Sequence, residues 1–508
     1  MTKQLFRVGL AAALISGAAC SNSPEGAGRQ VIRVSRAERS PLSDCAEDGR
    51  PPQAGVAYES AEVEGHLAAD PGRDEHLVAA WQQDRWNNGA ARGIVAAVSD
   101  DGGRTWTESG DTRTSLCTGG TTANGGGYRR VTDPWVALGP DGAAYLATLS
   151  VDPDAASPFG VNPDAILVAR SDDGGMSWDD PVTLVRDTDP TIHNDKPSIT
   201  ADPYRPGTAY AAWGTLTNDN EVISGVTSFS SSVDGGRTWE KPRIVYEPEG
   251  VGSTLGSQVL VLPHAGRLRG GLVMVATVVS TEVDTRTYSF RLVATAAADR
   301  KSRWSEPSTI AAPEPKEAID PISGDTIVSG RLLPDGAVDP QTGRVYVVWL
   351  DSPRGAKYNR VFLSSSSDGG RSWTPPVPVN RTPSGIPVPN RQVLLPAVHV
   401  LADGTVGVTY LDLRNNGRDG TAGRLETDAF LAFCRPQRDG DACVRGDGWA
   451  EKRITAESFD FRDAPITQGP FVGDYMGLSG NDDFLSLIGI VDAPAEVTQH
   501  FVRISPDA

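Results

Sequence analysis

The chain has 508 residues, of which 39% are hydrophobic and 22% are charged, so it can bury a sizeable core. Its formal net charge of −18 argues against nucleic-acid binding and against attachment to an anionic membrane through a basic face. The 55 glycines and 37 prolines indicate many turns rather than disorder, because the hydrophobic content is too high for a disordered chain.

The first 20 residues have the composition of an export signal. Lys3 and Arg7 precede an apolar run over 8–15, and small residues then lead to Cys20. This order is similar to that of a bacterial lipoprotein cleavage site, in which Cys20 becomes the lipidated first residue of the mature chain. We therefore expect an exported, cell-surface lipoprotein that reaches the membrane only through a lipid on Cys20.

Cleavage by the ordinary signal peptidase is the alternative, because Gly17 stands where lipoprotein sites usually carry Leu. The chain would then be secreted. Residues 21–60 divide into a polar tether and a short extended segment over 30–34, and the repeat-bearing domain takes up 61–508 without a linker. No stretch after the signal is long and apolar enough to cross a bilayer.

Four cysteines remain after Cys20, and an even number in an exported chain predicts disulfides. Cys434 and Cys443 flank a polar loop and are expected to close it. Cys45 and Cys117 are then left to pair with each other. A metal site is not expected, because no CxxC or His-rich spacing accompanies these cysteines.

An eight-residue phrase with Ser, Asp, two glycines and Trp at fixed spacing occurs four times. The copies are Ser99–Trp106, Ser171–Trp178, Ser232–Trp239 and Ser366–Trp373. Asp and Gly at these spacings are typical of a tight hairpin turn. The Trp leaves the turn on a fixed face, where it can pack between adjacent sheets. The repeat therefore predicts an all-β architecture.

Two degenerate copies, at Trp304 and Trp449, extend the series to six tryptophans at steps of 61 to 76 residues. A step of this length fits a four-stranded sheet with its loops, and a regular series of such units indicates a closed β-propeller. The tail adds three expected strands, over 471–475, 484–490 and 500–504. Residues 30–34 supply a fourth strand, and its pairing with the last would close the ring. We expect seven blades, with six as the alternative.

Charged and aromatic residues recur in the loops that face away from these turns. Between the second and third strands lie Trp81–Trp86, Trp349–Arg354 and Tyr410–Arg414. At the links between blades lie Thr132–Trp135, Asn194–Lys196 and Asp460–Asp463. A single Asp–Arg pair in a loop is usually an ion pair, but repetition at one end of the channel favours a binding pocket. We call this end the mouth.

The phrase is the Asp-box, S-x-D-x-G-x-x-W, and over most of its length the chain resembles the sialidase-like propellers. The resemblance implies an exo-acting glycoside hydrolase that uses an arginine triad, a Tyr paired with a Glu, and an Asp acid/base on terminal sialic acid. Tyr475-Met-Gly-Leu478 resembles the segment with the nucleophile. Arg85 resembles an arginine of the first blade, and Asp84 beside it stands for the acid/base. The family's Phe/Tyr-Arg-Ile-Pro motif is absent, and Ser257-Gln258 occupies the place of the Glu.

The candidate catalytic residues are therefore Tyr475 and Asp84. The candidate sugar-binding residues are Arg85, Asp133, Asp195, Asp351, Asp412, Arg414 and Arg462. No cofactor is expected, and the chain has no phosphate-binding loop. A Ser-His-Asp hydrolase is not expected either, because no nucleophile elbow is present. We expect a carbohydrate ligand. The alternative to a hydrolase is a non-catalytic propeller that binds a glycan or a protein at the mouth.

Overall fold

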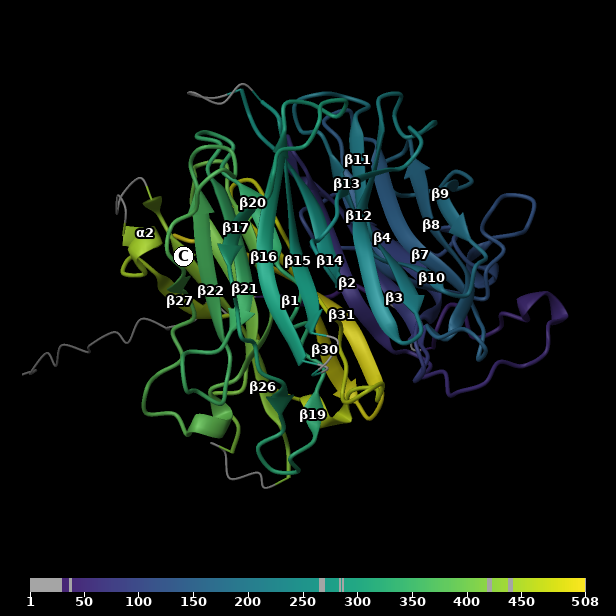
Figure 1. Ribbon diagram of the computed structural model, residues 1–508. Coiled ribbons are helices and arrows are strands. Elements are labelled where there is room, and N and C mark those ends of the chain that lie inside the picture. The colour runs from purple at the N-terminus through teal and green to yellow at the C-terminus, as the bar shows by residue number, and fades with distance from the viewer. Residues whose placement is uncertain are drawn as a thin grey trace, which may run out of the picture.

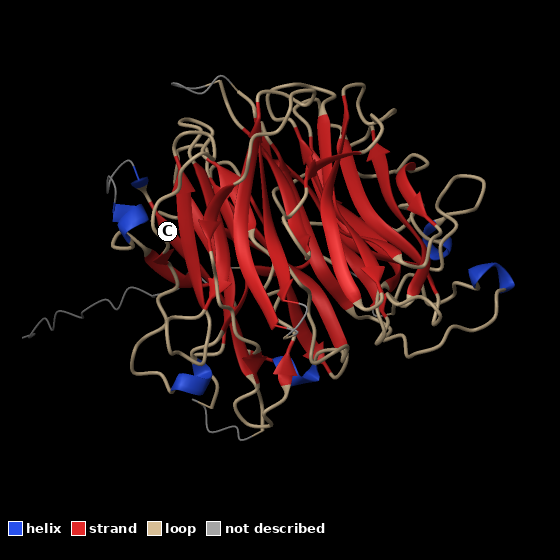
Figure 2. Ribbon diagram, viewed as in Figure 1, coloured by secondary structure: helices blue, strands red, loops and turns tan. Residues whose placement is uncertain are grey.

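The structure is a computed structural model that describes residues 30–507, apart from 36–38, 265–269, 283, 284, 286, 418–422 and 437–441. The fold is all-β, and the few helices within the described residues are short and lie at the periphery (Figure 2). These helices are η1 (Glu47–Gly49), η2 (Leu116–Thr118), η3 (Val388–Asn390), α2 (Ala442–Arg445) and η4 (Phe461–Asp463). The expected signal, the lipidation of Cys20 and the tether up to residue 29 lie outside the described residues. No helix in the described part of the chain is long and apolar enough to cross a membrane.

The strands form antiparallel sets of four that follow one another along the chain (Figure 1). The first set is β2 (Glu62–Asp70), β3 (Arg73–Arg85), β4 (Ala91–Ser99) and β5 (Thr107–Ser109). The second is β6 (Arg130–Leu138), β7 (Ala144–Pro153), β8 (Val161–Ser171) and β9 (Val182–Asp187). The third is β10 (Ile192–Ala201), β11 (Ala209–Asp219), β12 (Val222–Ser232) and β13 (Arg243–Tyr246). One pairing, Ala91 with Val131, joins the first two sets.

The remaining sets repeat this order. The fourth is β14 (Gly252–Val261), β15 (Leu272–Glu282), β16 (Thr287–Ala297) and β17 (Ser308–Ala311). The fifth is β20 (Asp335–Val338), β21 (Val345–Asp351), β22 (Arg360–Ser366) and β23 (Val377–Pro378). The sixth is β24 (Val393–Val400), β25 (Val406–Asp412), β26 (Glu426–Cys434) and β27 (Ala450–Arg453), with β28 (Phe459–Asp460) beside β26. A small hairpin of β18 (Ala318–Ile319) and β19 (Thr326–Ile327) precedes the fifth set.

The last set joins the two ends of the chain. It consists of β29 (Gly477–Ser479), β30 (Phe484–Ala493), β31 (Glu496–Ile504) and β1 (Val31–Arg33). Val31 pairs with Val502, as expected for the segment over 30–34. The expected strand over 471–475 is wrong, because β29 begins only at Gly477 and residues 471–475 belong to no strand, although the Glu64 N–H donates to the Val472 carbonyl at 3.2 Å.

The first strands of the sets lie against one another and border one central space. β2 contacts β6, and contacts then pass in turn to β10, β14, β20, β24 and β29. β29 in turn contacts β2. Because every set places its first strand on this central space, residues far apart in the chain meet there.

Each copy of the eight-residue phrase forms a turn between the third and fourth strands of its set. In the first copy the Asp101 carboxylate accepts from the Thr105 backbone N–H at 2.9 Å and from its hydroxyl at 2.7 Å. The Gly103 N–H donates to Ser99 Oγ at 2.8 Å, and the Trp106 indole donates to the Gly103 carbonyl at 3.1 Å. The Asp carboxylate and Ser hydroxyl make the same bonds in the other three copies.

The second glycine of the phrase also has a packing role. Gly103 has a φ of 87°, and a side chain there would meet the ring of Phe501 on β31. Trp106 packs against the same ring, with 5.4 Å between ring centres. The turn of one set thus packs against the neighbouring set, which is why the phrase needs both glycine and tryptophan.

Candidate functional site

The first strands share a break in their pairing near the middle. In β2, β6, β10, β14 and β24 the register with the second strand shifts by one residue. Residues at the break have positive φ angles: Glu64 (54°), Asp133 (53°), Lys196 (49°), Gly256 (63°) and Leu395 (50°). A positive φ is unfavourable for a residue with a side chain, and such positions gather at functional sites. Three of these residues, Glu64, Asp133 and Lys196, are ionisable and lie on neighbouring strands.

The Lys196 ammonium binds three carboxylates at the centre. Its Nζ donates to Asp133 Oδ1 at 2.6 Å, to Asp474 Oδ2 at 2.7 Å and to Glu64 Oε1 at 3.1 Å. The other oxygen of Glu64 accepts from the Gln82 amide. We call Glu64, Asp133, Lys196 and Asp474 the axial cluster. Because the three carboxylates share one ammonium, they are held close to one another, and of the three only Asp474 borders the cavities formed by the described residues.

The surroundings shift the pKa values of Glu64 and Asp474 in opposite directions. Burial raises the pKa of Glu64 to about 8. The positive charge of Lys196 lowers this pKa, whereas the negative charges of Asp133 and Asp474 raise it further. Burial also opposes the ionised form of Asp474, but Lys196 outweighs it and lowers the pKa of this carboxyl. Burial disfavours the charged form of Lys196, yet the carboxylates raise its pKa well above the usual value. At neutral pH the cluster thus holds a protonated and an ionised carboxyl together, as an acid–base pair requires.

Tyr475 lies beside the axial cluster in a group of rings. Its hydroxyl donates to the Pro134 carbonyl at 2.9 Å, and Lys196 Nζ lies 6.0 Å from its ring centre. The ring centres of Trp135 and His66 lie 5.4 Å and 6.3 Å away. Burial, reinforced by nearby carboxylates, raises the pKa of Tyr475 well above its usual value. The phenol is therefore neutral.

Cavities lie on both sides of the axial cluster. On the side of the turns, a cavity of about 320 Å³ is lined by the C-terminal halves of the first strands and by Tyr475. On the mouth side lie two hollows of about 440 Å³ and 320 Å³. Asp474 borders all three spaces, and Lys196 borders the inner cavity and the larger hollow. The Lys196–Asp474 ion pair therefore forms the floor of the mouth.

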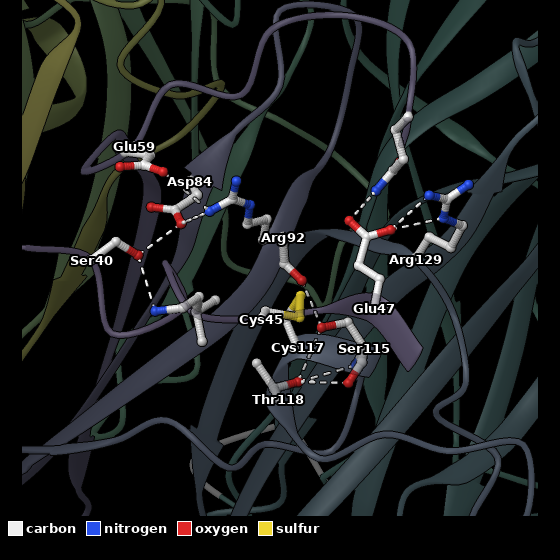
Figure 3. Close-up of a disulfide and its surroundings, with 12 residues drawn as sticks. Ser40, Cys45, Glu47, Glu59, Asp84, Arg92, Ser115, Cys117, Thr118 and Arg129 are labelled. Atoms are coloured by element: carbon white, nitrogen blue, oxygen red, sulfur yellow. Dashed lines mark hydrogen bonds and ion pairs between the residues drawn. A yellow bond between two sulfur atoms is a disulfide. The ribbon is translucent and has the colours of Figure 1, made fainter. Parts of the chain in front are cut away.

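Asp84 lies away from this floor, and its bonds fix the N-terminal segment. Its Oδ2 accepts from Ser40 Oγ at 2.7 Å and from Arg92 Nη1 at 3.2 Å (Figure 3). Its Oδ1 accepts from the Ser60 N–H at 3.0 Å. The side chain is fully buried. It borders none of the three spaces formed by the described residues.

Both expected disulfides are confirmed. Cys45 and Cys117 have their Cα atoms 5.3 Å apart, beside the contacts of Asp84 (Figure 3). Cys434 and Cys443 have theirs 5.8 Å apart. Both separations lie within the limit of about 7 Å for a bridge.

Of the predicted arginines, Arg85 lies at the mouth. Its Nη1 donates to Gln82 Oε1 at 2.7 Å and to Thr132 Oγ1 at 3.4 Å, and its guanidinium carbon lies 4.9 Å from the Phe471 ring centre. Gln82 in turn binds Glu64. Arg85 is therefore linked to the axial cluster through one amide.

The other two arginines bind carboxylates elsewhere. Arg414 binds Glu451 and, at 2.6 Å, Asp412, and its guanidinium stacks 3.8 Å from the Phe430 ring centre. Arg462 binds Asp320. Neither borders the mouth hollows or the inner cavity, so the three predicted arginines do not converge on one point.

Of the four aspartates predicted to bind sugar, two lie at or near the axial cluster and two have other partners elsewhere. Asp133 belongs to the axial cluster, and Asp195 is near enough to it for burial and the charge of Asp133 to raise its pKa. Asp412 is taken up by Arg414, and Asp351 accepts from the backbone N–H groups of its own loop and of a neighbouring one.

Sequence reasoning missed Glu64 and gave Lys196 no role. The signal that could have found Lys196 is a shared dipeptide. A residue followed by Pro occupies the break in three first strands, as Asp133-Pro134, Lys196-Pro197 and Leu395-Pro396. Glu64 has no such marker, because Gly65 follows it.

No family model and no curated protein matches the chain. Among solved structures, the chain is similar to an α-L-arabinanase of Penicillium chrysogenum complexed with arabinobiose (18% identity, 75% of this chain and 92% of that one, TM-score 0.45). It is similar to the α-L-arabinofuranosidase Arb93A of Fusarium graminearum (12%, 94% and 98%, 0.43). It is also similar to the NanB sialidase of Streptococcus pneumoniae (9%, 94% and 99%, 0.42). The chain resembles the sialidase-like propellers.

Proposed function

We propose that this protein is a glycoside hydrolase that cleaves the terminal sugar of a glycan at the mouth of a closed, seven-bladed propeller. The cycle of contacts among the first strands and the pairing of β1 with β31 support seven blades and closure. One observation above all supports the hydrolase. Glu64 and Asp474 share the Lys196 ammonium, while their pKa values are shifted in opposite directions.

In the proposed reaction, protonated Glu64 gives its proton to the glycosidic oxygen as the bond to the sugar breaks. Ionised Asp474 either activates a water or attacks the sugar carbon itself. Glu64 thus takes the role that we expected for Asp84. Lys196 holds both carboxylates in place and keeps Asp474 ionised.

Tyr475 stays a candidate nucleophile for the finer proposal, an exo-α-sialidase reaction, which the resemblance implies. A neutral phenol can attack beside the carboxylate of sialic acid with less repulsion than an anion would meet. The variant Tyr475→Phe separates the two routes. Loss of turnover favours the phenol, and retained turnover favours the carboxylate pair.

The experiment is an assay of the purified protein against fluorogenic glycosides, including a sialoside and a panel of neutral sugars. On the substrate that is cleaved, we expect Glu64→Gln to lower kcat/KM by about 10²–10⁴-fold. The matched control is Glu62→Gln, because Glu62 is buried on the same strand with a pKa raised to about 8, yet it accepts from the Gln499 N–H instead of Lys196. Equal effects of the two variants would overturn the role of Glu64.

A binding propeller without catalysis is the second candidate. The observation that favours it is the burial of Glu64. This residue is only 1% exposed, and both of its carboxyl oxygens are hydrogen-bonded within the protein. In that case the panel yields no cleavage, while glycan binding to the wild type and to Glu64→Gln is equal.

Export is supported by the two disulfides, which form in oxidising compartments. Anchoring through a lipid on Cys20 is a separate proposal. Mass spectrometry of the mature chain tests it, because a lipidated Cys20 would be the first residue, and a peptide that begins later would show ordinary secretion.

A further inference from the structure

We infer that the inner cavity, the space of about 320 Å³ on the turn side of the Lys196–Asp474 ion pair, is a second ligand site that takes a small organic cation with an apolar body. This site is separate from the proposed hydrolase site, because the ion pair lies between the cavity and the mouth. The inference follows from the position of the cavity, from its apolar wall and from one carboxyl group on that wall.

The inner cavity occupies the turn-side half of the central space. Ala201, Val261 and Val338 are the last residues of β10, β14 and β20, and all three border it. The cavity therefore runs from the ion pair to the ends of these strands, and a ligand approaches it from the face opposite the mouth. Its volume of about 320 Å³ lies within the range of small-molecule pockets, about 300–1,000 Å³.

The wall of the inner cavity is mainly apolar. The aliphatic side chains that border it include Val259, Val261, Leu333, Val338, Val398 and Leu478. Trp135 and Tyr475 add aromatic rings near the ion pair. Covering such a wall with apolar ligand surface is favourable, because it removes both surfaces from water. The body of the ligand is therefore expected to be hydrocarbon.

The histidines and the ion pair on this wall carry no unbalanced charge. Burial lowers the pKa of His66 to about 3, and burial also lowers the pKa of His399. Both rings are therefore neutral at pH 7. Lys196 and Asp474 bind each other at 2.7 Å. These four side chains give the cavity no excess of positive charge with which to hold an anion.

Asp335 adds a negative charge to the wall. It borders the inner cavity but neither hollow of the mouth, and its Oδ2 accepts from the Val398 N–H at 2.7 Å. Burial raises the pKa of Asp335 to about 6, and no charge of the described residues contributes to the shift. The carboxyl is therefore mostly ionised at pH 7 without a cationic partner. Arg85 and His193 lie near the axial cluster, but neither borders this cavity.

A protonated amine would supply the partner that Asp335 lacks. Carboxylates away from water are normally paired, and an ammonium makes short, charge-assisted hydrogen bonds to a single carboxylate. A metal ion needs more ligands than this, and the described residues contain no group of three His, Cys, Asp or Glu side chains that could hold one. The charge of Asp335 and the apolar wall together fit an amine with a hydrocarbon body.

The test is isothermal titration calorimetry of the whole mature protein at pH 7.5 with three naphthalene probes. The probes share one ring system and carry an aminomethyl, a hydroxymethyl or a carboxylate group. We expect one molecule of the amine to bind at least about tenfold more tightly than the alcohol, and the carboxylate to bind most weakly. Equal binding of amine and alcohol, tighter binding of the carboxylate, or binding of none of the three would overturn the inference.

A first variant ties the preference to one carboxyl. Asp335→Asn keeps the acceptor for the Val398 N–H and should reduce the advantage of the amine to less than about twofold. The matched control is Asp351→Asn. Asp351 is also half-buried with a pKa raised by burial, but it lies outside the inner cavity. A preference that survives in Asp335→Asn, or that the control also removes, would place the amine elsewhere on this acidic protein.

A second variant tests the cavity itself and does not depend on the folding of Asp335→Asn. Leu478 and Ile490 are both half-buried and pack against the same hydrophobic cluster, but only Leu478 borders the cavity. We expect Leu478→Trp to fill part of the space and weaken amine binding at least about tenfold, and Ile490→Trp to leave it unchanged. Equal effects of the two variants would show that the amine binds outside the inner cavity.

Discussion

The turn motifs and the axial cluster both depend on carboxylates, yet the two regions use them in opposite ways. In a turn, Asp101 is only partly buried and accepts from Thr105, four residues along the chain, and these bonds lower its pKa to about 2. In the cluster, Glu64 is buried and shares an ammonium with Asp474, and its pKa rises to about 8. A carboxylate whose partners are close in sequence stabilises a turn and stays ionised. A buried carboxyl whose partners come from distant strands keeps its proton near neutral pH and can take part in acid–base chemistry.

The largest expected effect comes from removing the cation of the cluster. Lys196→Met leaves three carboxylates buried together without their counter-charge, so we expect a loss of ~3–5 kcal/mol in the free energy of unfolding. Urea denaturation at pH 7 measures it. The matched control is Lys241→Met, because Lys241 is exposed. A loss no larger than that of the control would mean that this ammonium does not hold the cluster together.

An intermediate effect is expected from the glycine of a turn. Gly103→Ala places a methyl group against the ring of Phe501, which we expect to cost ~1–3 kcal/mol beyond the cost of the backbone conformation. Gly142→Ala is the control, since Gly142 has a φ of 79° and open space around it. Thermal unfolding of the two variants isolates the packing cost. Equal losses would show that the turn does not pack against the neighbouring sheet.

A separate effect is expected on the pH dependence of stability. The folded protein keeps the protons of Glu62 and Glu64 up to a pKa of about 8, whereas the unfolded chain releases them near 4.5. The unfolded state therefore binds fewer protons between these values, and stability falls as pH rises from about 4.5 to 8. Asp101 has the opposite sign, because its contribution is lost only as pH falls from 3.8 toward 2.

Denaturation series at pH 5 and pH 8.5 measure this slope. We expect Glu62→Gln to flatten it, because the amide has no proton to lose. An unchanged slope in this variant, or stability that rises toward pH 8, would contradict the raised pKa of Glu62.

The same contrast explains what could be predicted from the sequence. The turns could be predicted because Ser99, Asp101, Gly103 and Trp106 make their bonds within eight residues. The strand over 471–475 was mispredicted because its apolar residues Phe471 and Val472 are buried in the core without belonging to a strand. The axial cluster could not be predicted, because Lys196 is separated in sequence from Asp474 by 278 residues and from Glu64 by 132. Only the fold brings these groups to one centre, and only burial there sets their pKa values.

The most direct test of the acid–base pair is the protonation state of Glu64 itself, which needs no substrate. Infrared difference spectra between pH 6 and pH 9 follow protonated carboxyl groups, and comparison of wild type with Glu64→Gln and Glu62→Gln assigns each signal. We predict a carboxyl signal that is present at pH 7, disappears as pH passes about 8 and is absent from Glu64→Gln but retained in Glu62→Gln. A Glu64 carboxylate that is ionised throughout this range would contradict its role as the acid.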